Sequence, residues 1–195
     1  TQGEETLIDA GIEIYQRGTK LVTPKMIKTE ASKGGTANIA IMHEVSKTRM
    51  IDELCKVAHW KKFSEDGGVY PINPPPHVAD TILNRFGEWK FPSLAGILMT
   101  PTLRPDGSIL KEKGFDPATR LFLLDSPPMP EIPIEPTRED ALIALESLEE
   151  LLIEFPFVNE ASKSVALSAL ITPVVRGACN VVPMHVIRAP TPGSG

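Results

Sequence analysis

The distribution of proline constrains this chain more than any other feature of its sequence. Nineteen of its 195 residues are prolines, and most of them gather at residues 70–76, 92–105 and 127–136. Proline lacks a backbone N–H and fixes φ, so it is disfavoured in helix interiors and central strands. The three clusters therefore predict connections, and regular structure must form in the segments between them.

Those segments alternate between strand-like and helix-like patterns, which predicts an α+β fold. Alternating or apolar short runs predict a hairpin over 12–23, strands over 37–42, 91–99 and 121–124, and a second hairpin over 102–110 around Asp106-Gly107. Helical spacing predicts helices over 47–61, capped by Ser46 or Thr48, and over 77–87. Residues 28–37 and 114–120 are expected to be a loop and a turn.

The third proline cluster divides the chain. We expect a small accessory α+β domain over residues 1–124, a linker over 125–136, and a helical segment over 137–195 that leads into the first strand of a P-loop α/β domain. Thr137 is the expected cap of a helix whose leucines share one face, and a second apolar helix follows over 159–171. Both helices are expected to bury their apolar side chains.

The carboxyl end has the pattern of a phosphate-binding loop. Residues 184–187 are an expected strand, and a turn rich in glycine and proline follows them. In a P-loop, backbone N–H groups of such a turn surround phosphate oxygens, ahead of Lys and then Ser or Thr. The expected nucleotide-binding residues are Thr191, Pro192, Gly193, Ser194 and Gly195. Pro190 departs from the pattern, and a surface loop or a tail is the alternative interpretation.

Composition favours a folded chain and excludes several site classes. Apolar residues make up 42% of the chain, which is ample for a packed core, and the formal net charge of −5 argues against a dominant polyanion-binding surface. Cys55 and Cys179 lie far apart without metal-ligand spacing, so neither a zinc site nor a disulfide framework is indicated. We expect a cytoplasmic protein without membrane spans, resident metal or catalytic residues of its own.

A modest basic bias in the first third of the chain supplies candidate phosphate contacts. Lys56, Lys61, Lys62 and Arg104 are the candidate DNA-binding residues, against the alternative that they are solvated surface cations. Asp106 and Asp116 are either turn residues or a carboxylate pair for acid–base or metal chemistry, and the turn interpretation is favoured.

Three stretches of the chain resemble the replication proteins of phages, prophages and plasmids, which join a primase-like region to a P-loop helicase or ATPase. The stretches are residues 14–22, 92–116 and 155–176 with the glycine loop that follows. The middle stretch contains Pro101-Thr102-Leu103-Arg104-Pro105-Asp106-Gly107-Ser108.

The resemblance implies that the chain belongs to a larger ATPase acting in DNA replication. It implies ATP and Mg²⁺ in the parent protein, single-stranded or forked DNA as a partner, and homo-oligomers. The fragment is not expected to be active alone. Two alternatives stay open: a non-catalytic interaction module, and a winged-helix-like DNA binder formed by the short helices and hairpins of residues 47–124.

Overall fold

We analysed a computed structural model, which describes residues 2–31 and 34–188. The fold is mixed α+β, as predicted, with small and mostly antiparallel sheets. In chain order the elements are α1 (Gln2–Asp9), β1 (Tyr15–Arg17), β2 (Lys20–Ala31), β3 (Gly35–Glu44), α2 (Lys47–Val57), β4 (Lys61–Phe63), β5 (Val69–Pro71), α3 (Pro76–Leu83), β6 (Gly96–Leu98), β7 (Thr102–Leu103), β8 (Ile109–Leu110), β9 (Gly114–Asp116), β10 (Leu121–Leu123), α4 (Arg138–Glu150), α5 (Glu160–Val175) and the 3₁₀ turn η1 (Arg176–Ala178).

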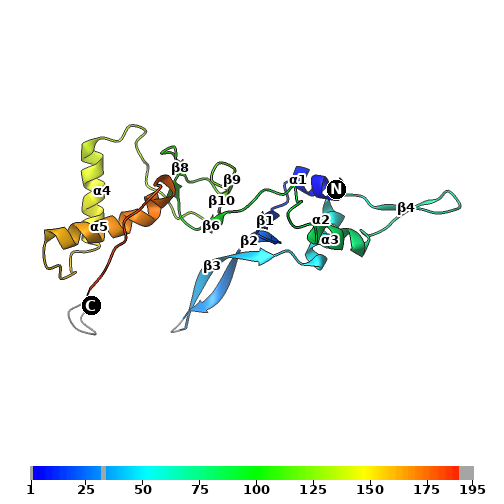
Figure 1. The fold of residues 1–195 in the computed structure, drawn as a ribbon, viewed down its shortest axis with the longest axis horizontal. Coiled ribbons are helices and arrows are strands. Elements are labelled where there is room, and N and C mark those ends of the chain that lie inside the picture. Colours follow the sequence, from blue (N-terminus) through cyan, green and yellow to red (C-terminus); the bar gives the residue numbers. More distant parts are fainter. Residues whose placement is uncertain (1, 32–33, 189–195) are drawn as a thin grey trace. The chain divides into compact units, whose positions relative to one another are not determined.

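The chain forms two compact units, which are described separately below. The first unit holds residues 1–99 and 112–125, and the second holds residues 100–111 and 126–195 (Figure 1). The β7–β8 hairpin therefore groups with the helices that follow it along the chain. Residues 125–136, the predicted linker, contain neither helix nor strand.

Three helices make the main core of the first unit. Leu7 of α1, Leu54 of α2 and Ile82 of α3 are all at most 1% exposed and belong to one cluster. Burying each such side chain contributes about 1.5–3 kcal/mol. The Ser46 hydroxyl caps α2 by accepting from the backbone N–H of Arg49 at 3.2 Å, which confirms one of the two expected caps.

A three-stranded antiparallel sheet of order β1-β2-β3 follows α1 (Figure 1). The predicted first hairpin is confirmed: β1 and β2 pair around a turn in which Gly18 has φ +58°, a conformation that glycine adopts without strain. The predicted loop over 28–37 is wrong for most of its length. Strand β2 continues to Ala31 and β3 begins at Gly35, because residues 28–31 pair in register with residues 35–38.

A second small core joins two sheets of the first unit. Strand β10 pairs parallel with β6 and antiparallel with β9. The predicted turn over 114–120 thus begins with a strand, and only residues 117–120 turn. Tyr15 from β1 lies 4.9 Å from Phe115 and 5.7 Å from Phe122, measured between ring centroids. These contacts hold β1 against the β6-β10-β9 sheet.

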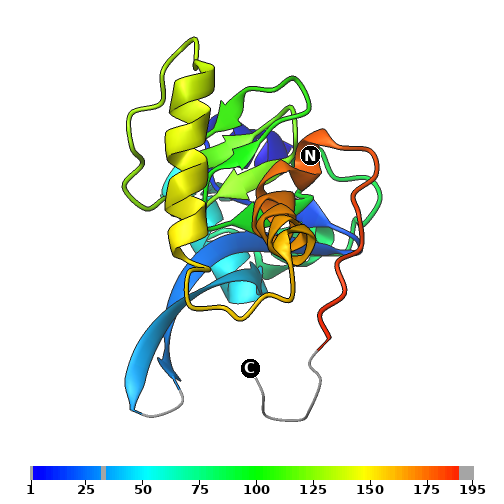
Figure 2. The same ribbon diagram turned by 90° about the vertical axis from the view of Figure 1, so that its left-hand side faces the viewer.

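In the second unit, α4 and α5 begin as predicted. The hydroxyl of Thr137 accepts from the backbone N–H of Asp140, and the carboxylate of Asp140 accepts from the backbone N–H of Thr137, a complete capping box. Asn159 caps α5, which runs through Pro173 without a break. Figure 2 shows α4 in yellow and α5 in orange.

The predicted burial of these two helices is wrong. No residue of α4 is buried, and Leu167 is the one buried residue of α5. Besides α4, α5 and η1, the described part of the second unit contains only the short β7–β8 hairpin as regular structure. The apolar side chains of the two helices therefore have little to pack against.

The strand predicted over 184–187 is also absent. Residues 181–188 have neither helix nor strand, and Met184 and Ile187 are 88% and 87% exposed. A strand is stable when its N–H and C=O groups pair with a neighbour. No strand of the described part of the second unit pairs with this segment, so its apolar pattern alone does not produce a strand.

Candidate nucleic-acid interface

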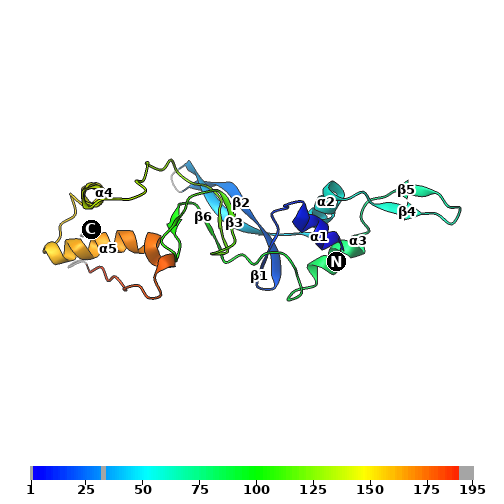
Figure 3. The ribbon, with the colours of Figure 1, turned by 90° about the horizontal axis from the view of Figure 1, so that it is seen from above.

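The β4–β5 hairpin brings together two of the four candidate DNA-binding residues. It follows α2 directly and precedes α3 (Figure 3). The turn closes through the backbone N–H of Gly67, which donates to the carbonyl of Ser64 at 3.0 Å, and Gly67 has φ +81°. Lys61 and Lys62 both lie on β4 and are exposed, and neither makes an ion pair within the described part of the chain.

The strand register places one lysine and one aromatic residue on each face of this hairpin. Lys62 lies opposite Tyr70, and Phe63 lies opposite Val69. Neighbouring residues of a strand point to opposite faces, so Lys61 and Phe63 share the other face. The side chain of Phe63 is 76% exposed, and that of Tyr70 is 58% exposed.

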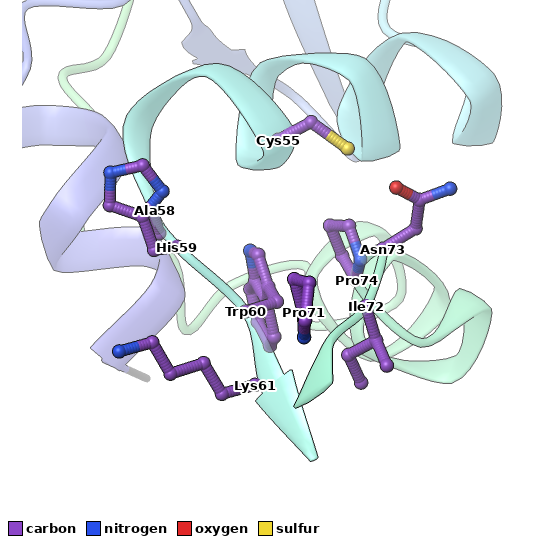
Figure 4. A pocket seen from close by; sticks show the side chains of 9 residues that line it. All are labelled: Cys55, Ala58, His59, Trp60, Lys61, Pro71, Ile72, Asn73 and Pro74. Carbon is purple, nitrogen blue, oxygen red and sulfur yellow. The ribbon is translucent and has the colours of Figure 1, made fainter. Parts of the chain in front are cut away.

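The root of the hairpin is fixed to α2. The indole Nε1–H of Trp60 donates to the carbonyl of Leu54 at 3.1 Å, and the carbonyl of Trp60 accepts from the backbone N–H of Ile72 at 3.0 Å. A shallow cavity of about 210 Å³ lies beside this root. Figure 4 shows its lining, which comprises Cys55, Ala58, His59, Trp60, Lys61, Pro71, Ile72, Asn73 and Pro74.

Charge is divided unevenly between the two units. The first unit contains 14 basic and 15 acidic residues, whereas the second contains 6 and 10. A polyanion is therefore repelled less by the first unit than by the second. Within the hairpin, the lysines lie on β4 and the carboxylates of Glu65 and Asp66 lie at the turn. Within the hairpin, attraction for a phosphate is therefore strongest along β4 and weakest at the turn.

The other two candidate residues serve the local structure. The ammonium of Lys56 lies 2.5 Å from the Asp52 carboxylate and 3.6 Å from that of Glu53, and the hydrogen bond to Asp52 raises the pKa of Lys56. Arg104 belongs to the second unit, where its guanidinium donates to the Ser108 hydroxyl at 3.1 Å and to the Ile109 carbonyl at 3.2 Å. Lys56 is thus paired within α2, and Arg104 is hydrogen-bonded within the β7–β8 hairpin.

Asp106 and Asp116 are turn residues, as favoured from the sequence. Asp106 accepts from the backbone N–H of Ser108 at 2.9 Å, and Asp116 accepts from that of Thr119 at 3.0 Å. Hydrogen bonds from the hydroxyl and the backbone of Ser108 lower the pKa of the Asp106 carboxyl. These bonds fix the turns that precede β8 and β10.

The proposed nucleotide-binding residues, Thr191, Pro192, Gly193, Ser194 and Gly195, lie outside the described residues. Within the described ranges, no group of three or more His, Cys, Asp and Glu side chains has the arrangement of a metal site. His185 Nε2 lies 3.1 Å from the hydroxyl of Ser168, an exposed residue of α5.

The hairpin itself was missed from the sequence. The helical spacing of Val57, Ala58 and Trp60 predicts that the helix continues to residue 61. The observed helix stops at Val57, where Ala58 takes an extended backbone. A usable signal was present, because Lys61-Lys62-Phe63 and Val69-Tyr70 flank a glycine turn.

No helix in the described residues is long and apolar enough to cross a bilayer. Comparisons with protein-family models, with curated proteins and with solved structures give no match for this chain.

Proposed function

We propose that the chain is the DNA-engaging region of a replication protein of the primase–helicase type, and that the β4–β5 hairpin contacts single-stranded DNA. The observation that carries the proposal is the strand geometry of the hairpin, which places an exposed lysine and an exposed aromatic residue on each face: Lys62 lies opposite Tyr70, and Lys61 lies two residues from Phe63 on β4. Single strands are bound by this combination: cations hold the phosphates, and bases stack on aromatic rings.

The hairpin suits a single strand better than a duplex groove. Its strands are three residues long, and its turn carries Glu65 and Asp66, which would meet the phosphates of a deeply inserted duplex. Lys62 and Tyr70 lie opposite each other, so one nucleotide can place its phosphate on the cation and its base on the ring. Sequence specificity is not expected, because every base presents a stacking face.

The wider assignment rests on the resemblance of three stretches to replication proteins. In that proposal Gly193, Ser194 and Gly195 contribute backbone N–H groups to ATP phosphates, and Mg²⁺ accompanies the nucleotide. The absence of a strand over 184–187 removes one of its supports. The proposal predicts that codons for Lys and then Ser or Thr follow Gly195; a stop codon or a polar linker there contradicts it.

DNA binding is tested by the fluorescence anisotropy of labelled oligo-dT across a salt series. Removing both hairpin lysines (K61A/K62A) should lower the salt slope by about 1.4, since each phosphate contact on a single strand contributes about 0.7. Removing both rings (F63A/Y70A) should weaken binding about tenfold or more without changing the slope.

The matched control removes the same charge from the β2–β3 hairpin, where Lys28 is exposed and Lys25 is half-buried. K25A/K28A on β2 should retain the wild-type affinity and slope. Neutralising the turn (E65Q/D66N) should tighten binding, because two carboxylates near the phosphate path disappear. Equal weakening by K25A/K28A and K61A/K62A, or no binding by the wild-type chain at low salt, would refute the assignment to β4–β5.

A further inference from the structure

The helices α4 and α5 present an apolar surface that nothing in the second unit covers. On α4, Leu142 and Ile143 are 45% and 59% exposed. On α5, Val165 is 49% exposed and Leu170 is 40% exposed. Exposed apolar side chains gathered on two consecutive helices indicate a site where another molecule binds.

The composition of α5 strengthens this argument. After Lys163, the remaining residues of α5 carry no charge, and apolar side chains occur all round the helix. A helix of that type is normally buried on most sides. Here the most extensive contacts of α5 are with β7 and η1, and its Thr172-to-Val175 end is tied to β7 by the Thr102 hydroxyl, which donates to the carbonyl of Val174 at 2.9 Å. The amino-terminal part of α5 is left open.

Acidic side chains border this surface. Between residues 131 and 163 the chain has nine acidic residues and two basic ones. One basic residue is already engaged, since the ammonium of Lys163 lies 2.8 Å from the Glu149 carboxylate and joins α5 to α4. Glu146, Glu150 and Glu154 make no ion pair within the described residues. The surface is apolar with an acidic border.

We infer that the α4–α5 surface binds an amphipathic helix of a partner protein, one whose apolar stripe is flanked by lysine or arginine. The apolar stripe of the partner helix covers the exposed leucines, valines and isoleucines of α4 and α5, and its basic flanks lie against the glutamates. A second copy fits less well, because it would set the same acidic border against itself. Nucleic acid and anionic membranes are repelled for the same reason. This inference is independent of DNA binding by the first unit.

The test uses a fluorescein-labelled helical peptide of leucine and lysine, with leucines at helical spacing. Two control peptides have glutamate in place of lysine, or the same composition in scrambled order. The lysine peptide should bind the full chain with an affinity that falls as salt rises. The glutamate and scrambled peptides should bind at least about tenfold more weakly, since each 1.4 kcal/mol is a factor of ten in affinity.

Variants then locate the site. Because Leu142 and Leu170 are both exposed, L142S/L170S should leave the circular dichroism spectrum unchanged. The same variant should weaken the binding of the lysine peptide about tenfold or more. E146Q/E150Q should also weaken the binding of the lysine peptide and make that binding less dependent on salt. The matched control is Ile27→Ser, which alters a residue of similar exposure, 38%, in the first unit and should have no effect.

Three results would overturn the inference. The first is the absence of peptide binding by wild-type protein. The second is equal affinity for the lysine and glutamate peptides. The third is a wild-type dimer in sedimentation equilibrium that L142S/L170S converts to monomer, which would assign the surface to a second copy. The peptide comparison needs no variant, so it stays decisive even if a substitution impairs folding.

Discussion

Tyr15 should make the protein lose stability at alkaline pH. Its side chain is 7% exposed and lies in the small core with Val22, Leu94 and Phe122. Burial, followed by the negative charge of Glu13, raises the pKa of Tyr15 from 10.0 to about 12. The phenolate is disfavoured in the folded chain because it would lose its hydration among aromatic rings.

The sign and size of the effect follow from proton linkage. Above pH 10 the unfolded chain releases the Tyr15 proton before the folded chain does, so unfolding is favoured as pH rises. The contribution of Tyr15 is fully present below about pH 10 and is lost as the pH approaches 12. The free energy of unfolding should fall by about 1.4 kcal/mol by pH 11 and by about 2.7 kcal/mol well above pH 12.

The titration can be followed directly. The chain has two tyrosines, so Tyr70→Phe leaves Tyr15 as the only phenol that absorbs near 295 nm on ionisation. The absorbance midpoint of the folded Y70F protein should lie near pH 12. Urea denaturation of Y70F at pH 9 and pH 11 gives the stability difference, and Y15F/Y70F measures what all other groups contribute over the same interval.

A folded Y70F protein whose tyrosine ionises with a midpoint near pH 10 would refute this reasoning. The same conclusion follows if Y70F and Y15F/Y70F lose equal stability between pH 9 and pH 11. In either case the ring would have to be hydrated, in conflict with its contacts to Phe115 and Phe122.

Three further predictions concern the core of the first unit and the cap of α4. Leu54→Ala, which empties a fully buried position of α2, should reduce the free energy of unfolding of the first unit by about 2–5 kcal/mol, measured by urea denaturation followed through tryptophan fluorescence. Thr137→Ala removes the capping box of α4 and should destabilise that helix by about 1 kcal/mol, detected as faster amide exchange over 138–145 with no change in α2; unchanged exchange would mean that the cap is not formed in solution. Since hydrogen bonds from Thr137 lower the pKa of Asp140, this cap should also weaken when the pH falls through that pKa.

Local sequence signals predicted the elements whose determinants lie within a few residues. Ser46 and Thr137 begin helices because their hydroxyls accept from an N–H three residues ahead. Asp106-Gly107 forms the turn of a hairpin because Asp106 accepts from Ser108 and Gly107 takes φ +85°. In each case the donor and acceptor are neighbours in the chain, so no distant contact is needed.

The candidate site was only partly predictable. Lys61 and Lys62 were predicted as candidate DNA-binding residues, but their position beside Phe63 and Tyr70 depends on the formation and register of the β4–β5 hairpin. That register is set by the turn at Gly67 and by the attachment of Trp60 to Leu54, which fixes where α2 ends. Helical spacing alone continued α2 through the residues that form β4.

The sequence by itself determined the α+β class, the helix starts and the tight turns, because capping and turn formation are short-range hydrogen bonding. Tertiary structure alone decided which apolar segments are buried. Leu54 and Leu145 both lie in helices with an apolar face, yet Leu54 is fully buried and Leu145 is not. Burial requires an opposing surface, and a helix's own sequence does not specify whether the rest of the chain supplies one.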